Sequence, residues 1–411
     1  IYMKTDGKPV DIALTNPVAM LEQRNDESTV YRSIGNAQID YRMHFLPDLR
    51  ANLNVGYDVS KSEGDVIIAD NSPMTYTSGN FKQGFGENTY YYQLKRNTLL
   101  DFYLNYAKEI GINNIDVMAG YSWQHFYNST KNRYPYSAAF AQSKGEEFYK
   151  EGDEYESENY LISFFGRLNY DYMGRYLAEI NMRYDGSSRF RRGSRWQWSP
   201  SFSLGWNIAQ EKFWESLTDI ANTLKLRVSY GELGNQNTTA WYPTYRDMIL
   251  KSSNGTWLQD GVKPNTAEPG NLVSNSLTWE KVRTWDIGFD YGFLSNRLTG
   301  SFDYYIRYTD GMVGPAPELP SILGTSAPKT NNCNLRTNGW ELSIGWRDRL
   351  KNGFGYSANL TLSDAKTIVT SYPSNATNTI GLNKYVEGRE VGEIWGLETI
   401  GIAKSENEMQ A

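Results

Sequence analysis

The residue types that carry most enzyme and metal chemistry are scarce in this 411-residue chain. It has one cysteine, Cys333, and two histidines, His44 and His125, which fall in separate segments. Metal clusters need several such ligands at close spacing, and nucleophilic catalysis needs a base beside its nucleophile. A lipase-type enzyme would need a serine or aspartate beside a histidine, and neither histidine has an evident partner. The sequence therefore predicts a protein that is not an enzyme.

Carboxylates crowd the stretch from 146 to 158. Its members are Glu146, Glu147, Glu151, Asp153, Glu154, Glu156 and Glu158. Calcium prefers such oxygens, but the run lacks the spaced Asp or Asn and the glycine of a calcium loop. We expect a solvated loop edge, with a loop calcium site as the lesser alternative and no other cofactor.

Aromatic residues are interleaved with Asn, Gln and Asp in segments that read as loops, and this combination suits binding. Rings beside amides fit sugar rings or peptide side chains. The alternative is that these rings pack the loops onto one another or onto a partner protein. The candidate residues for contact with a substrate or a lid protein are Tyr76, Phe81, Tyr90, Tyr134, Tyr136, Trp241, Tyr242, Tyr245 and Trp257.

The elements that must position these loops are strands, as the alternation between Trp196 and Ile208 shows. Even positions there are apolar, with Trp198 and Trp206 among them, and odd positions are polar or glycine. A period of two indicates a strand with one apolar and one polar face. Ten residues separate Trp196 from Trp206, which is about 33 Å along a strand. At a tilt of roughly 40° that strand rises about 25 Å, the height of the lipid-facing band of outer-membrane barrels.

The same alternation recurs about twelve times along the chain. The segments are 39–45, 49–59, 100–106, 115–123, 162–170, 178–184, 196–208, 224–230, 279–291, 298–308, 340–346 and 354–362. We therefore predict an all-β fold, an antiparallel transmembrane β-barrel of which residues 1–411 form one partial domain.

The connections between these segments also alternate in length. Short turns are expected at 46–48, 107–113, 172–175, 292–297 and 348–353, with a short helix in the connection 209–222. Long loops rich in Gly, Ser, Asn and Pro are expected at about 60–92, 128–158, 232–277, 310–336 and 364–411. Short periplasmic turns and long extracellular loops are typical of outer-membrane barrels.

Charge and composition agree with this interpretation. The polar faces carry both signs of charge, and each charge would cost about 2–4 kcal/mol at the lipid midplane, so they are expected to face the lumen. The net charge of −6 lacks the basic footprint of a nucleic-acid binder. The 31 tyrosines and 12 tryptophans suit a membrane interface. The expected interface belt consists of Trp196, Trp206, Trp279, Tyr291, Trp340 and Trp346.

A soluble or surface-anchored all-β carbohydrate-binding protein is the alternative from another class. It would have to bury about twelve apolar faces against a partner surface, and it would dissolve without detergent. The mean hydropathy of −0.61 does not separate the two, because a barrel strand needs only every second residue apolar.

Several motifs, in this order, resemble the SusC-like (SusC/RagA-type) TonB-linked outer-membrane transporters. They are Tyr170–Leu177, Arg183–Phe190, Trp196 to Trp206, Leu224–Gly231, Trp279 to Lys281, Asp303 to Tyr305, Asn338–Leu342 and Val391 to Ile402. Each motif alone is weak, whereas their order and spacing from about residue 160 to 403 are specific. The match is to a middle-to-late portion of the barrel.

The resemblance implies a multi-pass outer-membrane barrel of about 22 strands around an N-terminal plug, which is not in this chain. It also implies import of oligosaccharides or oligopeptides with energy relayed by TonB. A SusD-like lipoprotein would cap the extracellular mouth, in a dimer of such pairs. Because lumen charges and loop aromatics are both present, the sequence leaves glycan and peptide open as substrates.

Overall fold

Antiparallel strands make up nearly all of the regular structure. The computed structural model describes residues 17–70, 72, 86–133, 151–236, 238, 240–251, 255–317, 320, 322, 324–325, 327–375, 385–396 and 401. The helical pieces are α1 (Pro17–Gln23) and the 3₁₀ turns η1 (Arg192–Ser194), η2 (Ile208–Gln210), η3 (Lys212–Leu217) and η5 (Pro373–Asn375). Within these residues, every helix is too short to span a bilayer with an apolar stretch.

The described residues form twelve long strands and one small hairpin. The long strands are β1 (Arg24–Arg42), β2 (Leu49–Ile68), β3 (Glu87–Ile110), β4 (Asn113–Arg133), β5 (Glu151–Tyr172), β6 (Tyr176–Ser187), β7 (Trp196–Asn207), β8 (Ala221–Asn235), β11 (Glu280–Phe293), β12 (Leu298–Val313), β13 (Asn331–Arg349) and β14 (Gly355–Ser371). Each contains most of one predicted segment. The hairpin pairs β9 (Met248–Lys251) with β10 (Thr266–Pro269).

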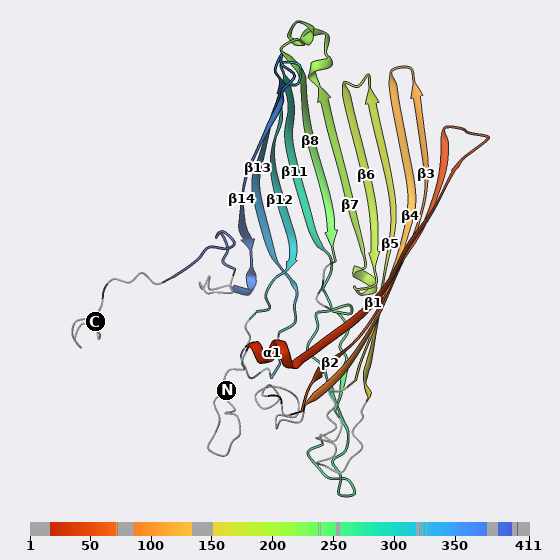
Figure 1. The fold of residues 1–411 in the computed structure, drawn as a ribbon, viewed down its shortest axis with the longest axis vertical. Helices are drawn as coiled ribbons and strands as arrows, with labels where there is room; N and C mark the ends of the chain where they lie inside the picture. The colour runs from red at the N-terminus through yellow and green to blue at the C-terminus, as the bar shows by residue number, and fades with distance from the viewer. Residues whose placement is uncertain are drawn as a thin grey trace. The chain divides into compact units, whose positions relative to one another are not determined.

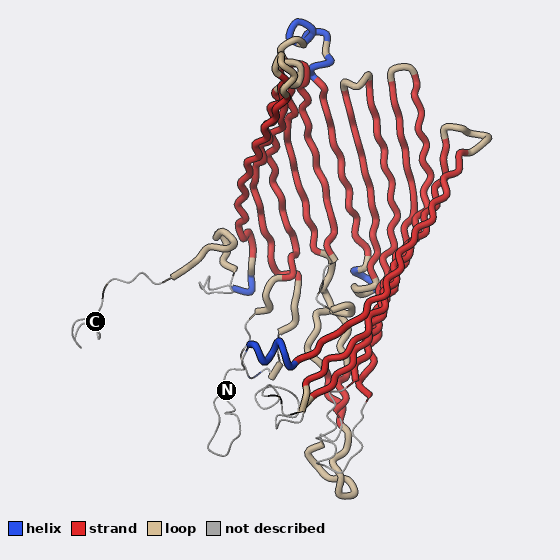
Figure 2. The backbone as a smooth tube through the Cα atoms, viewed as in Figure 1, coloured by secondary structure: helices blue, strands red, loops and turns tan. Residues whose placement is uncertain are grey.

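The chain divides into two compact units. The first consists of residues 1–105 and 120–163, and the second of residues 106–119 and 164–411. Strands β3, β4 and β5 contribute residues to both. Strand order in the first unit is β1-β2-β3-β4-β5, and in the second β3-β4-β5-β6-β7-β8-β11-β12-β13-β14. Neighbours in the sheet are thus consecutive along the chain, except that the hairpin of β9 and β10 comes between β8 and β11 (Figure 1; Figure 2).

Register places like residues on one face of the second unit. Opposite β7, strand β6 pairs Ile180 with Phe202 and Tyr184 with Trp198, and both pairs are apolar. Opposite β11, strand β8 pairs Tyr230 with Trp285. The alternation seen in the sequence therefore continues across strands as a common apolar face.

This apolar face has no covering layer among the described residues. Its members Leu204, Ile287 and Trp285 stay exposed, whereas a soluble sheet would bury them in a core. Among the described residues, buried apolar side chains form small groups near the long loops, such as Cys333, Val369 and Tyr372, and a further pair, Ile208 and Ala221, at the turn between β7 and β8. An exposed apolar face of this extent is rare in soluble monomers and marks contact with a partner or a membrane.

Glycines lie directly opposite aromatic residues at four places in the ladders. The pairs are Gly35 with Tyr57 in the first unit, and Gly186 with Trp196, Gly300 with Tyr291, and Gly339 with Tyr305 in the second. A Cβ atom at any of these glycines would overlap the ring opposite it. Each ring therefore lies across the neighbouring backbone, the arrangement known as aromatic rescue.

The short turns fall where the sequence predicts them. In the second unit they are residues 111–112, 173–175, 208–220, 294–297 and 350–354. The short helix expected between Glu211 and Thr223 consists instead of the 3₁₀ turns η2 and η3. Two of these turns place bulky residues in the left-handed region, Met173 and Leu294, each with a φ of 56°.

Candidate functional site

One arginine joins three strands on the polar face of the second unit. The guanidinium of Arg227 on β8 donates to both carboxylate oxygens of Asp290 on β11, at 2.9 Å each. It also forms an ion pair with Asp303 on β12, at 2.9 Å. Bidentate pairs of this kind are among the stronger and more directional charged contacts.

A glycine makes this three-strand bridge possible. Gly288 on β11 is paired with Arg227 on one side and with Asp303 on the other. A Cβ atom at Gly288 would overlap the Asp303 carboxylate and lie 2.9 Å from the Phe302 carbonyl. The missing side chain therefore opens the path along which the guanidinium reaches across β11.

Other arginines of the polar faces also have carboxylate partners. In the first unit, Arg32 pairs with Asp58 at 2.8 Å and Arg50 with Asp40 at 2.7 Å. In the second unit, Arg167 lies 3.8 Å from Asp116 and Arg183 lies 2.7 Å from Asp185. These pairs are partly exposed, so solvent screens them and each contributes little to stability. Their effect is to make the polar surface charged but locally balanced.

A recess of about 440 Å³ opens on the same polar face of the second unit, near the short-turn ends of β5 to β8. Asp171, Glu179, Lys225 and Asp286 line it together with Arg227. At its wall, a Cβ on Gly205 would lie 3.2 Å from the Lys225 side chain and 3.4 Å from that of Leu177, so a larger residue would crowd the recess. A recess lined by charges of both signs is suited to contact with a polar protein surface or a polar ligand, and not with an apolar ligand.

From Glu151 onward the acidic run is part of a strand rather than a loop edge. Glu154, Glu156 and Glu158 lie on β5 and contact side chains of β4. The Tyr127 hydroxyl donates to Glu156 at 2.7 Å, and His125 lies 3.0 Å from Glu158. The described residues contain no group of three metal-ligating side chains. The side chains of residues 146–153 lie outside the described part of the chain.

Arginines of the loop after β6 fasten the long loop 236–279. Arg191 donates from Nε and Nη2 to the carbonyl of Thr244, at 3.2 and 3.0 Å, and its guanidinium lies 5.9 Å from the Tyr245 ring. Arg189 donates to the Thr238 hydroxyl at 3.4 Å. It also lies 5.6 Å from the Trp241 ring. Burial lowers the pKa of the Arg189 guanidinium from its usual value.

The predicted loop aromatics thus separate into groups. Trp241 and Tyr245 lie beside these arginines, although Tyr245 is also exposed. Tyr242 and Trp257 are exposed, and Tyr90 on β3 is half-buried. The remaining candidates, Tyr76, Phe81, Tyr134 and Tyr136, lie outside the described residues. Their roles in binding stay predictions.

The comparisons with known proteins identify the family. The profile of the family described as "TonB dependent receptor-like, beta-barrel" matches residues 6–401. The chain is 33% identical to the TonB-dependent receptor SusC of Bacteroides thetaiotaomicron over 353 residues, 85% of this chain and 34% of that protein. It is 27% identical to the TonB-dependent receptor P3 of Formosa agariphila, over 96% of this chain and 39% of that protein.

The chain belongs to the TonB-dependent receptor-like β-barrel family.

Solved structures agree on the fold. The structure of the RagAB peptide transporter superposes with a TM-score of 0.78 at 17% identity, covering 94% of this chain and 43% of that one. The chain spans between a third and two fifths of the length of the curated relatives named above. The relatives are named as receptors and transporters rather than enzymes.

Family membership gives each face its surroundings. The protein is an outer-membrane β-barrel, and this chain supplies part of its wall. The apolar face of the second unit is therefore the lipid-facing one, and the Arg227 bridge and the recess face the lumen. The soluble binding protein considered from the sequence is not supported.

The predicted belt residues differ in their exposure. Trp196 and Trp206 are exposed at the two ends of β7, and Tyr291, Trp340 and Trp346 are half-buried. Trp279 is a correction, because only 5% of it is exposed. It lies just before β11, donates from its indole to the Arg195 carbonyl at 2.8 Å and packs 5.4 Å from Phe190. It therefore cannot face lipid.

Sequence reasoning missed the contacts by which Arg189 and Arg191 hold loop 236–279, which we call the arginine clamp. Residues 187–195 read Ser-Ser-Arg-Phe-Arg-Arg-Gly-Ser-Arg, with four arginines and no acidic residue. Such a run in a short loop needs acceptors, and in this fold backbone carbonyls supply several of them. That excess of donors was the available signal.

Proposed function

We propose that the protein imports a nutrient oligomer, an oligosaccharide or an oligopeptide, across the bacterial outer membrane with energy relayed by TonB. The observation that carries this proposal is the two-faced wall. One face is apolar and uncovered, and the other is polar with charges balanced by the Arg227 bridge. A balanced polar lumen lets a large hydrophilic cargo pass without binding it tightly by charge alone.

The long loops are the proposed contact surface for cargo and lid. The rings of Trp257 and Tyr242 are exposed on loop 236–279, which the arginine clamp holds in place. We propose a SusD-like lipoprotein as the lid, in a dimer of transporter–lid pairs. The family assignment and the names of the relatives support this partner.

The deciding experiment is mass spectrometry of small molecules released from the intact protein, extracted from outer membranes in mild detergent. We expect oligosaccharides or oligopeptides that exchange with added cargo of the same class. Trp257→Ala should then weaken cargo binding several-fold, while Leu258→Ala, at the exposed neighbouring position, should not. A protein that is recovered in the soluble fraction without detergent would overturn the proposal.

A further inference from the structure

Positive charge is concentrated in two connections at the long-loop end of the second unit. Residues 187–195, which we call the arginine loop, and loop 236–279 together carry seven basic and three acidic residues, a net charge of +4. The chain as a whole has a net charge of −6. The positive excess is therefore local, and it lies where the long loops of an outer-membrane barrel meet the extracellular medium.

The arginine loop binds its own cations with neutral acceptors. Arg191 donates to the Thr244 carbonyl, and Arg195 donates from Nε to the Phe190 carbonyl at 3.0 Å. Arg192 on η1 is exposed and makes no side-chain hydrogen bond or ion pair with the described residues. Because a guanidinium has five N–H donors, most donors of these three side chains have no acceptor in the described part of the chain.

Several arginines on the neighbouring strands are neutralised in place instead. Arg183 lies 2.7 Å from Asp185, and Arg283 donates to Asp310 at 2.7 Å. The charges of the arginine loop are left for a molecule outside the described residues. Cations that have only neutral acceptors favour an anion over a neutral ligand, because a charge-assisted hydrogen bond is the stronger kind.

The fold holds the arginine loop in place. Phe190 is fully buried, and it packs 5.4 Å from the Trp279 ring. The Arg195 carbonyl accepts hydrogen bonds from the Trp279 indole at 2.8 Å and from the Ser187 backbone N–H at 3.1 Å. Guanidinium groups on a fixed backbone lose less conformational entropy when they bind a planar acid group.

Aromatic rings lie beside these cations. The Arg191 guanidinium is 5.9 Å from the Tyr245 ring, and the Tyr242 ring is 6.4 Å from the same ring. Tyr245 is 50% exposed and Tyr242 is 43% exposed. Such rings suit a sugar residue, whose apolar ring face can stack while its acid group meets a guanidinium. An acidic peptide offers the charge without that ring face.

We infer that the arginine loop and the rings of Tyr242 and Tyr245 form a binding site for an anionic oligosaccharide, one whose sugars carry carboxylate or sulfate groups. The inference rests on the proposed import function, and it narrows the cargo to an acidic glycan. All four basic residues of the loop are arginine, whose planar fork of donors matches both acid groups.

Binding of defined tetrasaccharides to the intact protein in mild detergent tests this inference. Tetragalacturonate should bind roughly tenfold more tightly than its carboxyl-reduced form, which keeps the sugar chain and loses the charge. A sulfated galactose tetrasaccharide and its desulfated form are the second pair, and they distinguish sulfate from carboxylate as the preferred group. A preference for the anion in either pair supports the inference, and equal affinities in both pairs would overturn it.

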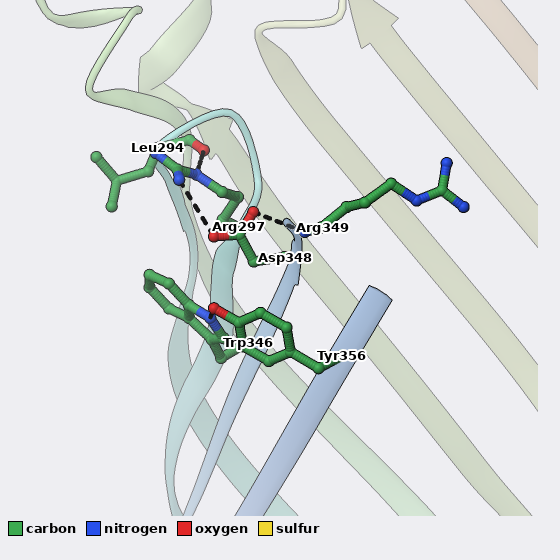
Figure 3. A network of polar contacts seen from close by, with 6 residues as sticks. All are labelled: Leu294, Arg297, Trp346, Asp348, Arg349 and Tyr356. Atoms are coloured by element: carbon green, nitrogen blue, oxygen red, sulfur yellow. Dashed lines mark hydrogen bonds and ion pairs between the residues drawn. The ribbon is translucent and has the colours of Figure 1, made fainter. Parts of the chain in front are cut away.

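Arg192→Gln and Arg195→Gln locate the site. Each should weaken binding of the preferred anionic tetrasaccharide by about fivefold, and Arg192 has no side-chain contact in the described structure whose loss would disturb folding. Arg349→Gln is the matched control, because Arg349 is exposed at the short-turn end of β13 and its side chain extends away from the Arg297–Asp348 pair (Figure 3). The control should keep the original affinity. An equal loss in the control, or no loss in either loop variant, would contradict the assignment.

Two further measurements separate this inference from its alternatives. Tetraglutamate that binds as tightly as the anionic tetrasaccharide would overturn the assignment to a glycan. Neutral oligosaccharides released from the intact protein would overturn this inference and leave the import proposal standing. Tight binding of the anionic tetrasaccharide without its uptake by cells would do the reverse.

Discussion

The two ends of the strands in the second unit use the same residue types for opposite purposes. At the long-loop end, Trp279 is buried and donates to a main-chain carbonyl, and Arg191 clamps the carbonyl of Thr244. At the short-turn end, Trp206 is exposed and donates to a carboxylate, and Arg297 pairs with Asp348.

The difference lies in what covers each end. Loop 236–279 folds over its own end of the sheet, so rings and guanidinium groups there become internal packing. Apart from 208–220, the short turns have two to five residues, which are too few to cover the end of the sheet, so the rings there remain exposed. Residue type alone therefore does not tell a belt residue from a packing residue.

Trp279→Ala is the test of this comparison with the largest expected effect. Removing a buried tryptophan that also satisfies the Arg195 carbonyl should lower the free energy of unfolding by about 3–5 kcal/mol. Chemical denaturation in detergent would measure it. Trp346→Ala, at the exposed end, should cost clearly less, and equal losses would contradict the distinction between the two ends.

Gly288→Ala probes the region between the two ends. The new Cβ would displace Asp303 and break the three-strand bridge, with an expected loss of about 1–3 kcal/mol. Gly231→Ala on β8 is the control, because a Cβ there meets only Ser201 at 3.5 Å. Hydrogen exchange should rise at β11 and β12 while residues 188–195 and 208–220 stay unchanged.

Arg191→Lys addresses the clamp alone. A lysine cannot reproduce the two donors that meet the Thr244 carbonyl, so the loss should be about 1 kcal/mol. Faster hydrogen exchange at residues 240–247 would report the release. Arg192→Lys, at an exposed neighbouring position on η1, should leave this exchange unchanged. If Arg191→Lys also left it unchanged, the positive charge alone would be sufficient and the two hydrogen bonds would not matter.

Leu294→Asn is expected to act in the opposite direction. Asparagine tolerates a left-handed backbone, so the variant should be more stable in detergent by about 1 kcal/mol. Leu350→Asn, outside the left-handed region, should show no gain in detergent.

Glu211 gives the smallest expected effect, through pH. Its hydrogen bond from Tyr176, then that from Trp206, lowers its pKa below the ordinary glutamate value. The contact is therefore fully stabilising above about pH 4.3, and it is lost as pH falls through the lower folded pKa. The difference in stability between the protein and Glu211→Gln should therefore disappear as pH falls from about 4.3 through the lower folded pKa. A stability difference that persists below that pKa would contradict this assignment.

The alternation of residues was enough to locate the twelve strands, because lipid on one side and polar surroundings on the other impose a period of two. It did not give their lengths. Strand β5 begins at Glu151, yet the sequence predicts it only from about residue 162. Toward its long-loop end the residues on both faces are polar, so the ladder continues where the pattern stops.

The candidate site was less predictable, because it depends on how loops fold back. Trp279 and Trp285 are both at odd positions, which predicted that both face lipid. However, β11 begins only at Glu280, so Trp279 lies outside the strand and does not follow its alternation. The hairpin of β9 and β10 has only four residues in each strand, too few for a readable period. The Arg227 bridge depends on the register of three strands, which no local pattern contains.

The glycines opposite aromatic rings have a consequence for assembly. A strand that slips by one residue turns its apolar side chains to the wrong face and is penalised at once. A slip by two residues keeps every face correct and is silent to that penalty. It would, however, move Tyr291 from Gly300 to Leu298 or Phe302, where its ring has no room to lie across the backbone. These pairs therefore disfavour a two-residue shift in strand register, which the alternation of apolar and polar residues does not penalise.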